Sequence, residues 1–196
     1  MLLGNGTPTT AVAEKVLRRM EQSRARNLKE LLPAANETIS IPSIQRQLKP
    51  GTGLIEFWVS GSAAAAVYIT SNDAGVVKAG ISQAGLSAVQ ELAGALARRH
   101  STNWRALARQ VSENLGISRI PIHQASQWLI VADGVLNRIP FEVLEHEGKL
   151  LIEKAEIAYL PSAHLLAQRL EASPTHRRRW PWELTMSAFA DPQPDS

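Results

Sequence analysis

The sequence predicts an α/β protein in which a β-sheet is flanked by helices and preceded by an amino-terminal helical arm. Two observations lead to this fold class. The run Trp128–Val131 is apolar without interruption, which is typical of a central strand that is covered on both faces. Segments before and after this run carry apolar residues at helical spacing, as expected of helices that pack on a sheet.

The length and composition are those of a folded protein. At 196 residues, the chain suits one domain, or one domain plus a helical arm. Apolar residues make up 44%, which is too many for a disordered chain. The chain has no cysteine, so disulfides, thiolate metal sites and cysteine catalysis are excluded within these residues. No apolar run is long enough for a signal peptide or a membrane span, and we expect a cytoplasmic protein.

An amphipathic helix is expected from Ala11 to Leu32. Its apolar positions are Val16, Leu17, Met20, Leu28, Leu31 and Leu32. A threonine just before it can cap the helix, and Pro33 ends it. Because a lone helix is marginal in water, we interpret residues 1–33 as an arm that ends a helical-repeat region, and residues 34–196 as the domain. The apolar stripe of such an arm should be partly exposed in this chain.

Three strands with a common apolar face are expected next. The elements are a short helix Ile41–Leu48, with Pro42 at its first position, and strands Leu54–Val59, Ala65–Thr70 and Val76–Ile81. The first strand alternates, with Ile55, Phe57 and Val59 on one face. Turns rich in glycine, serine and asparagine join the strands as a hairpin followed by a third strand. Such a set can be stable where a single hairpin is not.

Helices and strands alternate through the rest of the chain. The expected elements are helices Leu86–Leu96 and Trp104–Leu115, strand Gln127–Ala132, a helix beginning at Pro140, an extended segment Leu150–Tyr159, helix Ala163–Leu170, a basic loop Ser173–Pro181 and a last strand Leu184–Phe189. Gly116 is placed to end the second of these helices, and Ser162 to cap the helix that begins at Ala163. Phe141 is expected to pack under the buried strand.

Asp133 is the first candidate for chemistry, because it follows the buried strand where ligands of α/β proteins gather. No histidine or second carboxylate stands at metal-ligand spacing from it. Glu142 and Asn137 are the nearest polar partners. We interpret Asp133-Gly134 as a turn, since Asp and Gly both favour turns.

Ser162 and His164 are the second candidate, as a nucleophile and a base. They are two residues apart at a helix start, so their side chains should point to different faces, and Ser162 is better explained as an N-cap. The other histidines are His100, His123, His146 and His176. They form no H-x-x-x-H pair and no cluster. We therefore assign no catalytic, cofactor-binding or metal-binding residue.

The net charge of +3 arises mainly from two basic segments. These are the arm, with Lys15, Arg18, Arg19, Arg24, Arg26 and Lys29, and the loop Arg177–Arg179 beside Trp180 and Trp182. Basic residues interleaved with aromatic ones can bind nucleic acid. A solvated helix face and a loop explain the same pattern, so nucleic-acid binding is kept only as an alternative.

Two segments carry the clearest family signal. WLIVADGVLNRIPFEVL from Trp128 matches an apolar strand followed by a P-D-G-x-L-x-x-I/L-P-F-E-x-L motif, and AYLPSAHLL from Ala158 matches a Y-L-P-S element. PGTGLIEFWVSG from Pro50 is similar to an opening strand, and AFADP from Ala188 to the end of a following strand. Together they resemble the CHAT domain family, caspase-like peptidases associated with tetratricopeptide repeats.

The resemblance implies a caspase- or separase-like fold and a parent class of bacterial cysteine endopeptidases regulated through helical repeats. Family members attack the peptide carbonyl with a cysteine thiolate, while a histidine moves protons. Both catalytic residues lie in a later segment of the family, the histidine in an H-x-S/T/A-x-H-G context. None of the five histidines here has that context, and no cysteine is present.

We therefore expect the amino-terminal half of a CHAT domain, from a truncated, split or cleaved gene product, without peptidase activity of its own. The alternative is a genuine protein-interaction module, a pseudo-peptidase half. The expected partners are proteins, either helical repeats or a carboxy-terminal half, with neither membrane nor cofactor. Because no Lys or Pro guards Leu184–Phe189 as a sheet edge, self-association is also expected.

Overall fold

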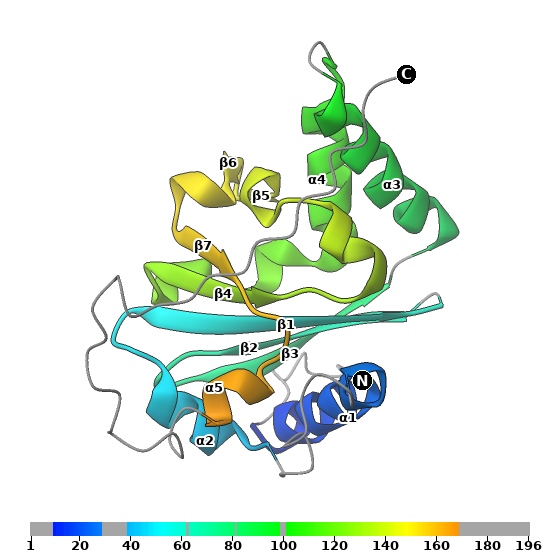
Figure 1. The fold of residues 1–196 in the computed structure, drawn as a ribbon. Coiled ribbons are helices and arrows are strands. Elements are labelled where there is room, and N and C mark those ends of the chain that lie inside the picture. The colour runs from blue at the N-terminus through cyan, green and yellow to red at the C-terminus, as the bar shows by residue number, and fades with distance from the viewer. Residues whose placement is uncertain (1–9, 29–38, 62, 81, 99–100, 169–196) are drawn as a thin grey trace, which may run out of the picture.

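A mixed β-sheet forms the middle layer of the molecule, with helices on both faces (Figure 1). The computed structural model describes residues 10–28, 39–61, 63–80, 82–98 and 101–168. The strands of the main sheet are β1 (Thr52–Ser60), β2 (Ala63–Ile69), β3 (Ala74–Gly80), β4 (Gln127–Val131) and β7 (Glu156–Tyr159). They lie side by side in the order β3-β2-β1-β4-β7. The predicted α/β class, with a sheet flanked by helices, is confirmed.

The sheet has an antiparallel half and a parallel half that meet at β1. In the hairpin half (β1–β3), β1 pairs antiparallel with β2, placing Leu54 opposite Ile69, and β2 pairs in the same way with β3. In the parallel half (β4, β7 and the residues between them), β4 runs parallel to β1 on one side and to β7 on the other. The predicted hairpin with a third strand and the predicted central strand at Trp128–Val131 are therefore both confirmed.

One face of the sheet is covered by α3 (Gln83–Ala97), α4 (Trp104–Leu115) and a series of short elements (Figure 1). These are η1 (Ile117–Arg119), η2 (Ile122–Gln124), η3 (Gly134–Arg138), η4 (Phe141–Val143), β5 (Glu145–His146), β6 (Lys149–Leu150) and η5 (Leu151–Glu153). The core on this face includes Phe57, Trp128 and Phe141. Gly116 ends α4 with φ of 66°, as predicted for a glycine in that place.

The indole of Trp128 fills the junction between the two halves of the sheet. Gly53 of β1 lies opposite Trp128 of β4, and a Cβ atom at position 53 would overlap the indole ring. Trp128 is fully buried, and its Nε1 donates a hydrogen bond to the carbonyl oxygen of Ile122 at 3.0 Å. The polar edge of the ring is thus satisfied inside the core, and glycine at position 53 leaves room for the ring itself.

The opposite face is covered by α1 (Thr10–Leu28), α2 (Ile41–Gln47) and α5 (His164–Gln168) (Figure 1). Ser40 caps α2: its Oγ accepts from the backbone N of Ser43 at 3.2 Å, and Ser43 Oγ accepts from the backbone N of Ser40. The core on this face is built from Ala13, Leu17, Met20, Ile41, Ile44, Leu54, Val67, Ile69 and Val131, among others.

The expectation of a partly exposed arm is wrong for the described part of α1. Ala13, Leu17 and Met20 are buried on the sheet side, where α1 contacts β2 and β3. The reason is that the hairpin half has apolar side chains on both faces, and α1 covers the second one. The interpretation of this helix as the end of a helical-repeat region stays a prediction, and the expected residues after Leu28 lie outside the described part of the chain.

Two other predictions need correction, and two cannot be placed. Leu150–Tyr159 is not one extended segment, because η5 interrupts it between β6 and β7. The helix expected at Pro140 is only the 3-10 turn η4. The basic loop Ser173–Pro181 and the strand Leu184–Phe189 lie outside the described residues.

Candidate functional site

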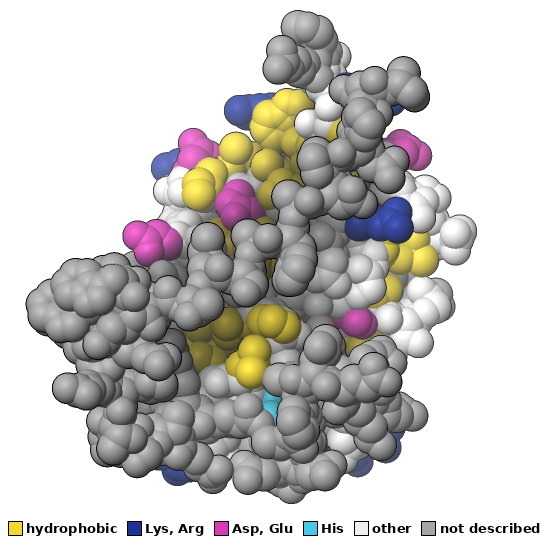
Figure 2. All heavy atoms as spheres, viewed as in Figure 1, with side chains coloured by type: hydrophobic (Ala, Val, Ile, Leu, Met, Phe, Trp, Pro, Cys, Tyr) yellow, Lys and Arg dark blue, Asp and Glu magenta, His cyan; other side chains and the backbone are white. Residues whose placement is uncertain are grey.

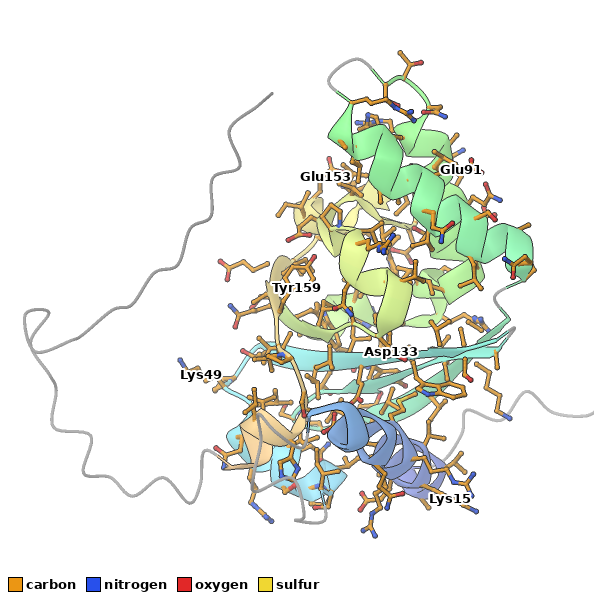
Figure 3. All side chains as sticks on the ribbon, turned by 45° about the vertical axis from the view of Figure 1, so that its right-hand side comes forward. Lys15, Lys49, Glu91, Asp133, Glu153 and Tyr159 are labelled. Atoms are coloured by element: carbon orange, nitrogen blue, oxygen red, sulfur yellow. The ribbon has the colours of Figure 1, made fainter. Side chains whose placement is uncertain are left out.

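Asp133 ties the end of β4 to the end of β1. The backbone N of Val59 donates a hydrogen bond to Asp133 Oδ2 at 3.1 Å, beyond the last paired residues of the two strands. The carbonyl oxygen of Asp133 accepts from the backbone N of Leu136 at 3.0 Å, and Gly134 has φ of 52°. Figure 3 shows Asp133 against the sheet, on the face away from Lys15. The predicted turn role is confirmed, and the link to Val59 is an additional one.

Tyr159, at the end of β7, joins the edge of the sheet to the η4 turn. Its hydroxyl donates to Glu142 Oε2 at 2.6 Å and accepts from the backbone N of Phe141 at 2.7 Å. Phe141 is fully buried, and its ring centroid lies 4.9 Å from that of Phe57 in β1. The predicted burial of Phe141 is confirmed. The pairing of Tyr159 with Glu142 was not foreseen from the sequence, although each residue stands in one of the two motifs that carry the family signal.

The chemistry open to Tyr159 is limited by its surroundings. Partial burial, and after it the hydrogen bond to the Glu142 carboxylate, raises the pKa of Tyr159 above its ordinary value. The phenol therefore stays protonated at neutral pH and serves as a hydrogen-bonding group, not as a base. Glu142 is correspondingly held as an acceptor for Tyr159.

Ser162 ties the same segment to the other face of the sheet. Its hydroxyl donates to Glu21 Oε2 of α1 at 2.6 Å and accepts from the backbone N of His164 at 3.0 Å. The backbone N of Ala163 donates to Glu21 Oε1 at 3.3 Å. Ser162, Glu21 and His164 are all buried. The predicted N-cap role of Ser162 is confirmed, but its buried partner Glu21 was not foreseen from the sequence.

Tyr159–Ser162, which we name the YLPS segment, therefore has an anchor on each side of the sheet. Tyr159 is held from the face of α3 and α4, and Ser162 from the face of α1. Between them, the backbone N of Leu160 donates to the carbonyl oxygen of Ile130 at 2.9 Å and prolongs the pairing of β7 with β4. The polar side chains of this segment are engaged in holding the edge of the sheet, so their arrangement suits positioning and not catalysis.

β7 forms one edge of the described sheet. It pairs with β4, and no described residue pairs with its other side. Two large apolar side chains are exposed in this region: Tyr159 at 47% and Ile152, in the preceding turn η5, at 55%. An open strand edge with apolar side chains nearby is a surface to which another polypeptide can add.

His146 holds the β5–β6 hairpin to the rest of the domain. Its Nε2 lies 3.0 Å from the carbonyl oxygen of Ile120, so this nitrogen carries the proton, and its Nδ1 accepts from Lys154 Nζ at 2.9 Å. Lys154 also pairs with Glu147 at 2.5 Å. This hydrogen bond to Lys154 is the main cause that lowers the pKa of Glu147. The cluster is a structural one, since His146 is buried and all of its ring contacts are satisfied.

The remaining candidates are not brought together. His123, in η2, is exposed, while His100 and His176 fall outside the described residues. Among the residues that the structure describes, no three His, Asp or Glu side chains gather as they would around a metal ion. Nor does any helix in the described ranges have both the length and the apolar character needed to cross a bilayer.

The structure describes only part of the two basic segments. Arg177–Arg179, Trp180 and Trp182 lie outside the described residues. On α1, Arg18 pairs with Glu14 at 2.9 Å, and Lys15 and Arg19 are exposed. In Figure 2, the described Lys and Arg side chains lie apart from one another on the face shown. Nucleic-acid binding stays an untested alternative.

Comparison with known families identifies the carboxy-terminal part of the chain. The model of the CHAT domain matches residues 80–196, which is more than half of the chain. This range contains β4, the Asp133 turn, Glu142 and the YLPS segment, whereas the opening motif expected from Pro50 lies outside it. No curated protein matches the chain.

Proposed function

The chain belongs to the CHAT domain family, and from this premise we propose that it forms the amino-terminal portion of a caspase-like cysteine peptidase domain and has no peptidase activity of its own. In this role it provides a folded platform, and a polypeptide that carries the catalytic histidine and cysteine adds to it. Location in the cytoplasm and association with helical repeats belong to the same proposal.

The observation that carries the proposal is the lack of a thiol in a chain of this family. Caspase-like hydrolysis needs a thiolate nucleophile, and these 196 residues contain no cysteine. Ser162 is a poor substitute, because its hydroxyl is buried and donates to Glu21. Asp133 and Glu142 are likewise committed, to Val59 and Tyr159. The family motifs are thus used for structure in the described part of the chain.

The side of β7 with which no described residue pairs supports the second part of the proposal. A strand edge offers backbone donors and acceptors in fixed positions, and here the YLPS segment holds that edge from both faces of the sheet. We place the attachment of the catalytic polypeptide on this side of the molecule.

A peptidase assay with two components tests the proposal. The purified chain should hydrolyse no member of a peptide library. Addition of a polypeptide that carries the family's histidine and cysteine should give hydrolysis that a thiol-directed inhibitor abolishes. Hydrolysis by the chain alone that is lost in Ser162→Ala but kept in the matched control Ser126→Ala, an exposed serine, would overturn the proposal.

A non-catalytic protein-interaction module is the second candidate. The exposed Ile152 and Tyr159 beside the β7 edge favour it, because they would suit a permanent protein partner as well as a missing half of the domain. If the chain gains no activity with the catalytic polypeptide, and is a stable monomer by light scattering that binds little hydrophobic dye, the interaction module is the better explanation.

A further inference from the structure

Two carboxylates of α1 each hold the start of another helix. Glu14 Oε2 accepts a hydrogen bond at 2.9 Å from the backbone N of Ile41, the first residue of α2. Glu21 accepts from the backbone N of Ala163 and from Ser162 Oγ, immediately before α5. Because Glu14 and Glu21 are about two helical turns apart, both side chains leave α1 on the same side.

The two helices that α1 holds in this way are connected to different strands of the sheet. α2 leads into β1, the strand at which the two halves of the sheet meet, and α5 follows β7, the edge strand. α2 and α5 also contact each other beneath the sheet. α1 therefore connects the helix that leads into the central strand β1 with the helix that follows the edge strand β7.

The two links are not equivalent. The start of α2 has its own capping box between Ser40 and Ser43, which does not depend on Glu14. The start of α5 has Ser162, whose hydroxyl proton is directed at Glu21 while its oxygen accepts from His164. Because these groups are buried, loss of Glu21 would remove the acceptor of Ser162 Oγ and of the backbone N of Ala163 inside the fold. α5 depends on α1 more strongly than α2 does.

In the part of α1 whose side chains are described, one side of the helix packs on the sheet. Ala13, Leu17 and Met20 face inward with the partly buried Val16 beside them, while Val12, Lys15 and Arg19 are exposed. Figure 3 shows Lys15 on the side of α1 that points away from the sheet. A helix that packs through one side and pairs with no strand opens at a lower free energy than the central strands.

We propose that α1 can detach from the sheet, and that its docking controls the order of the β7 edge through Glu21. While α1 is seated, its carboxylate holds Ser162 and, with it, the YLPS segment. Displacement of α1 releases Ser162 and the start of α5, whereas α2 keeps its serine cap. This coupling goes beyond the proposed function and stands whether or not the chain has peptidase activity.

Hydrogen exchange of the full chain, measured by mass spectrometry, tests the coupling with two matched variants. Glu21→Ala and Glu14→Ala make the same substitution on the same side of α1, and alanine preserves the helix propensity. Glu21→Ala should raise the exchange rate in Leu160–Gln168 by on the order of tenfold or more, since a buried hydrogen bond to a charged group is lost. Glu14→Ala should leave that segment unchanged and affect at most the first turn of α2.

The control segment is Gln127–Val131, which should exchange equally slowly in both variants and in the original chain. If Glu21→Ala does not fold, Ser162→Ala takes its place. Its effect on Leu160–Gln168 should be smaller but still confined there, because Ala163 keeps its bond to Glu21. Equal exchange of Leu160–Gln168 in both glutamate variants, or no change in it when Glu21 or Ser162 is replaced, would overturn the proposal.

Discussion

The hairpin half and the parallel half of the sheet are stabilised in different ways. In the hairpin half, every strand pairs with its neighbour in sequence, and each tight turn sets the register of the strands beside it. In the parallel half, β4 and β7 are short, and residues far apart in the chain hold them: Val59 with Asp133, and Glu21 with Ser162. Local pairing therefore specifies one half, while side-chain hydrogen bonds across the fold specify the other.

The same contrast appears at the two edges of the sheet. β3 pairs with β2 along its whole length, carries the exposed Lys78 and is covered by α1. A lysine on an edge strand discourages pairing with another chain. β7 has a shorter register and exposed apolar side chains near it. Among the described strands, β3 is therefore the better protected edge, and β7 is the edge to which our proposal assigns a partner.

The largest expected effect tests the core of the parallel half. Phe141→Ala should lower the free energy of unfolding by about 3–5 kcal/mol, because the ring is fully buried against Phe57. Denaturant melts will measure this loss of free energy. The control is Val143→Ala, at a half-buried neighbouring position, which should cost less. A loss under about 1 kcal/mol would mean that η4 is not part of the core and that the parallel half is held by hydrogen bonds alone.

The next effect tests whether α1 completes the hairpin half. Leu17→Ala should cost about 2–3 kcal/mol, in the lower part of the usual range, because α1 can shift to fill part of the space. Val12→Ala, on the exposed side of the same helix, should change little. Equal melting curves for the two variants would restore the interpretation of α1 as an arm that does not pack on the domain.

The same substitution, tyrosine to phenylalanine, made once in each half of the sheet, compares how strongly the two halves depend on hydrogen bonds. Tyr159→Phe removes contacts of 2.6 and 2.7 Å and should cost about 1.5 kcal/mol. Tyr68→Phe removes only a contact of 3.4 Å to Asp73 and should cost under about 0.5 kcal/mol. If the cost at Tyr68 equals or exceeds that at Tyr159, the contrast between the halves does not extend to their polar contacts.

The smallest change in stability is expected at the open edge. Ile152→Lys should alter the free energy of unfolding by no more than about 0.5 kcal/mol, because the side chain is mostly exposed. It should nevertheless reduce self-association in light scattering and lower dye binding, since it places a charge beside β7. Val12→Lys is the matched control on the other face. If both variants reduce self-association and dye binding equally, the surface responsible for self-association does not lie at Ile152.

The elements that could be predicted from the sequence are those with a local pattern. The unbroken apolar run at Trp128–Val131 indicated a central strand, and Gly116 and Ser162 marked a helix end and a helix start. Alternation in β1 indicated one apolar face, at Ile55, Phe57 and Val59, but Glu56 on the other face is also fully buried, because helices cover that face as well. The inward packing of α1 was missed for the same reason.

The candidate site was less predictable, because its contacts join distant residues. Glu21 and Ser162 are separated by 141 positions, and Tyr159 and Glu142 by 17. No periodicity links such pairs, since their spacing reflects the fold and not a helix or a strand. One available signal was that polar residues recur inside otherwise apolar motifs, which indicates a hydrogen-bonded partner in the fold.

The close fit of Trp128 over Gly53 gives the protein a built-in optical probe. Trp128 is fully buried at the seam between β1 and β4, while Trp58 and Trp104 are partly exposed. Its fluorescence should therefore be blue-shifted and should move toward red when water enters the seam. A chain that keeps Trp128 and has its four remaining tryptophans replaced by phenylalanine would report, in real time, whether β4 stays docked on β1 when a partner binds at β7.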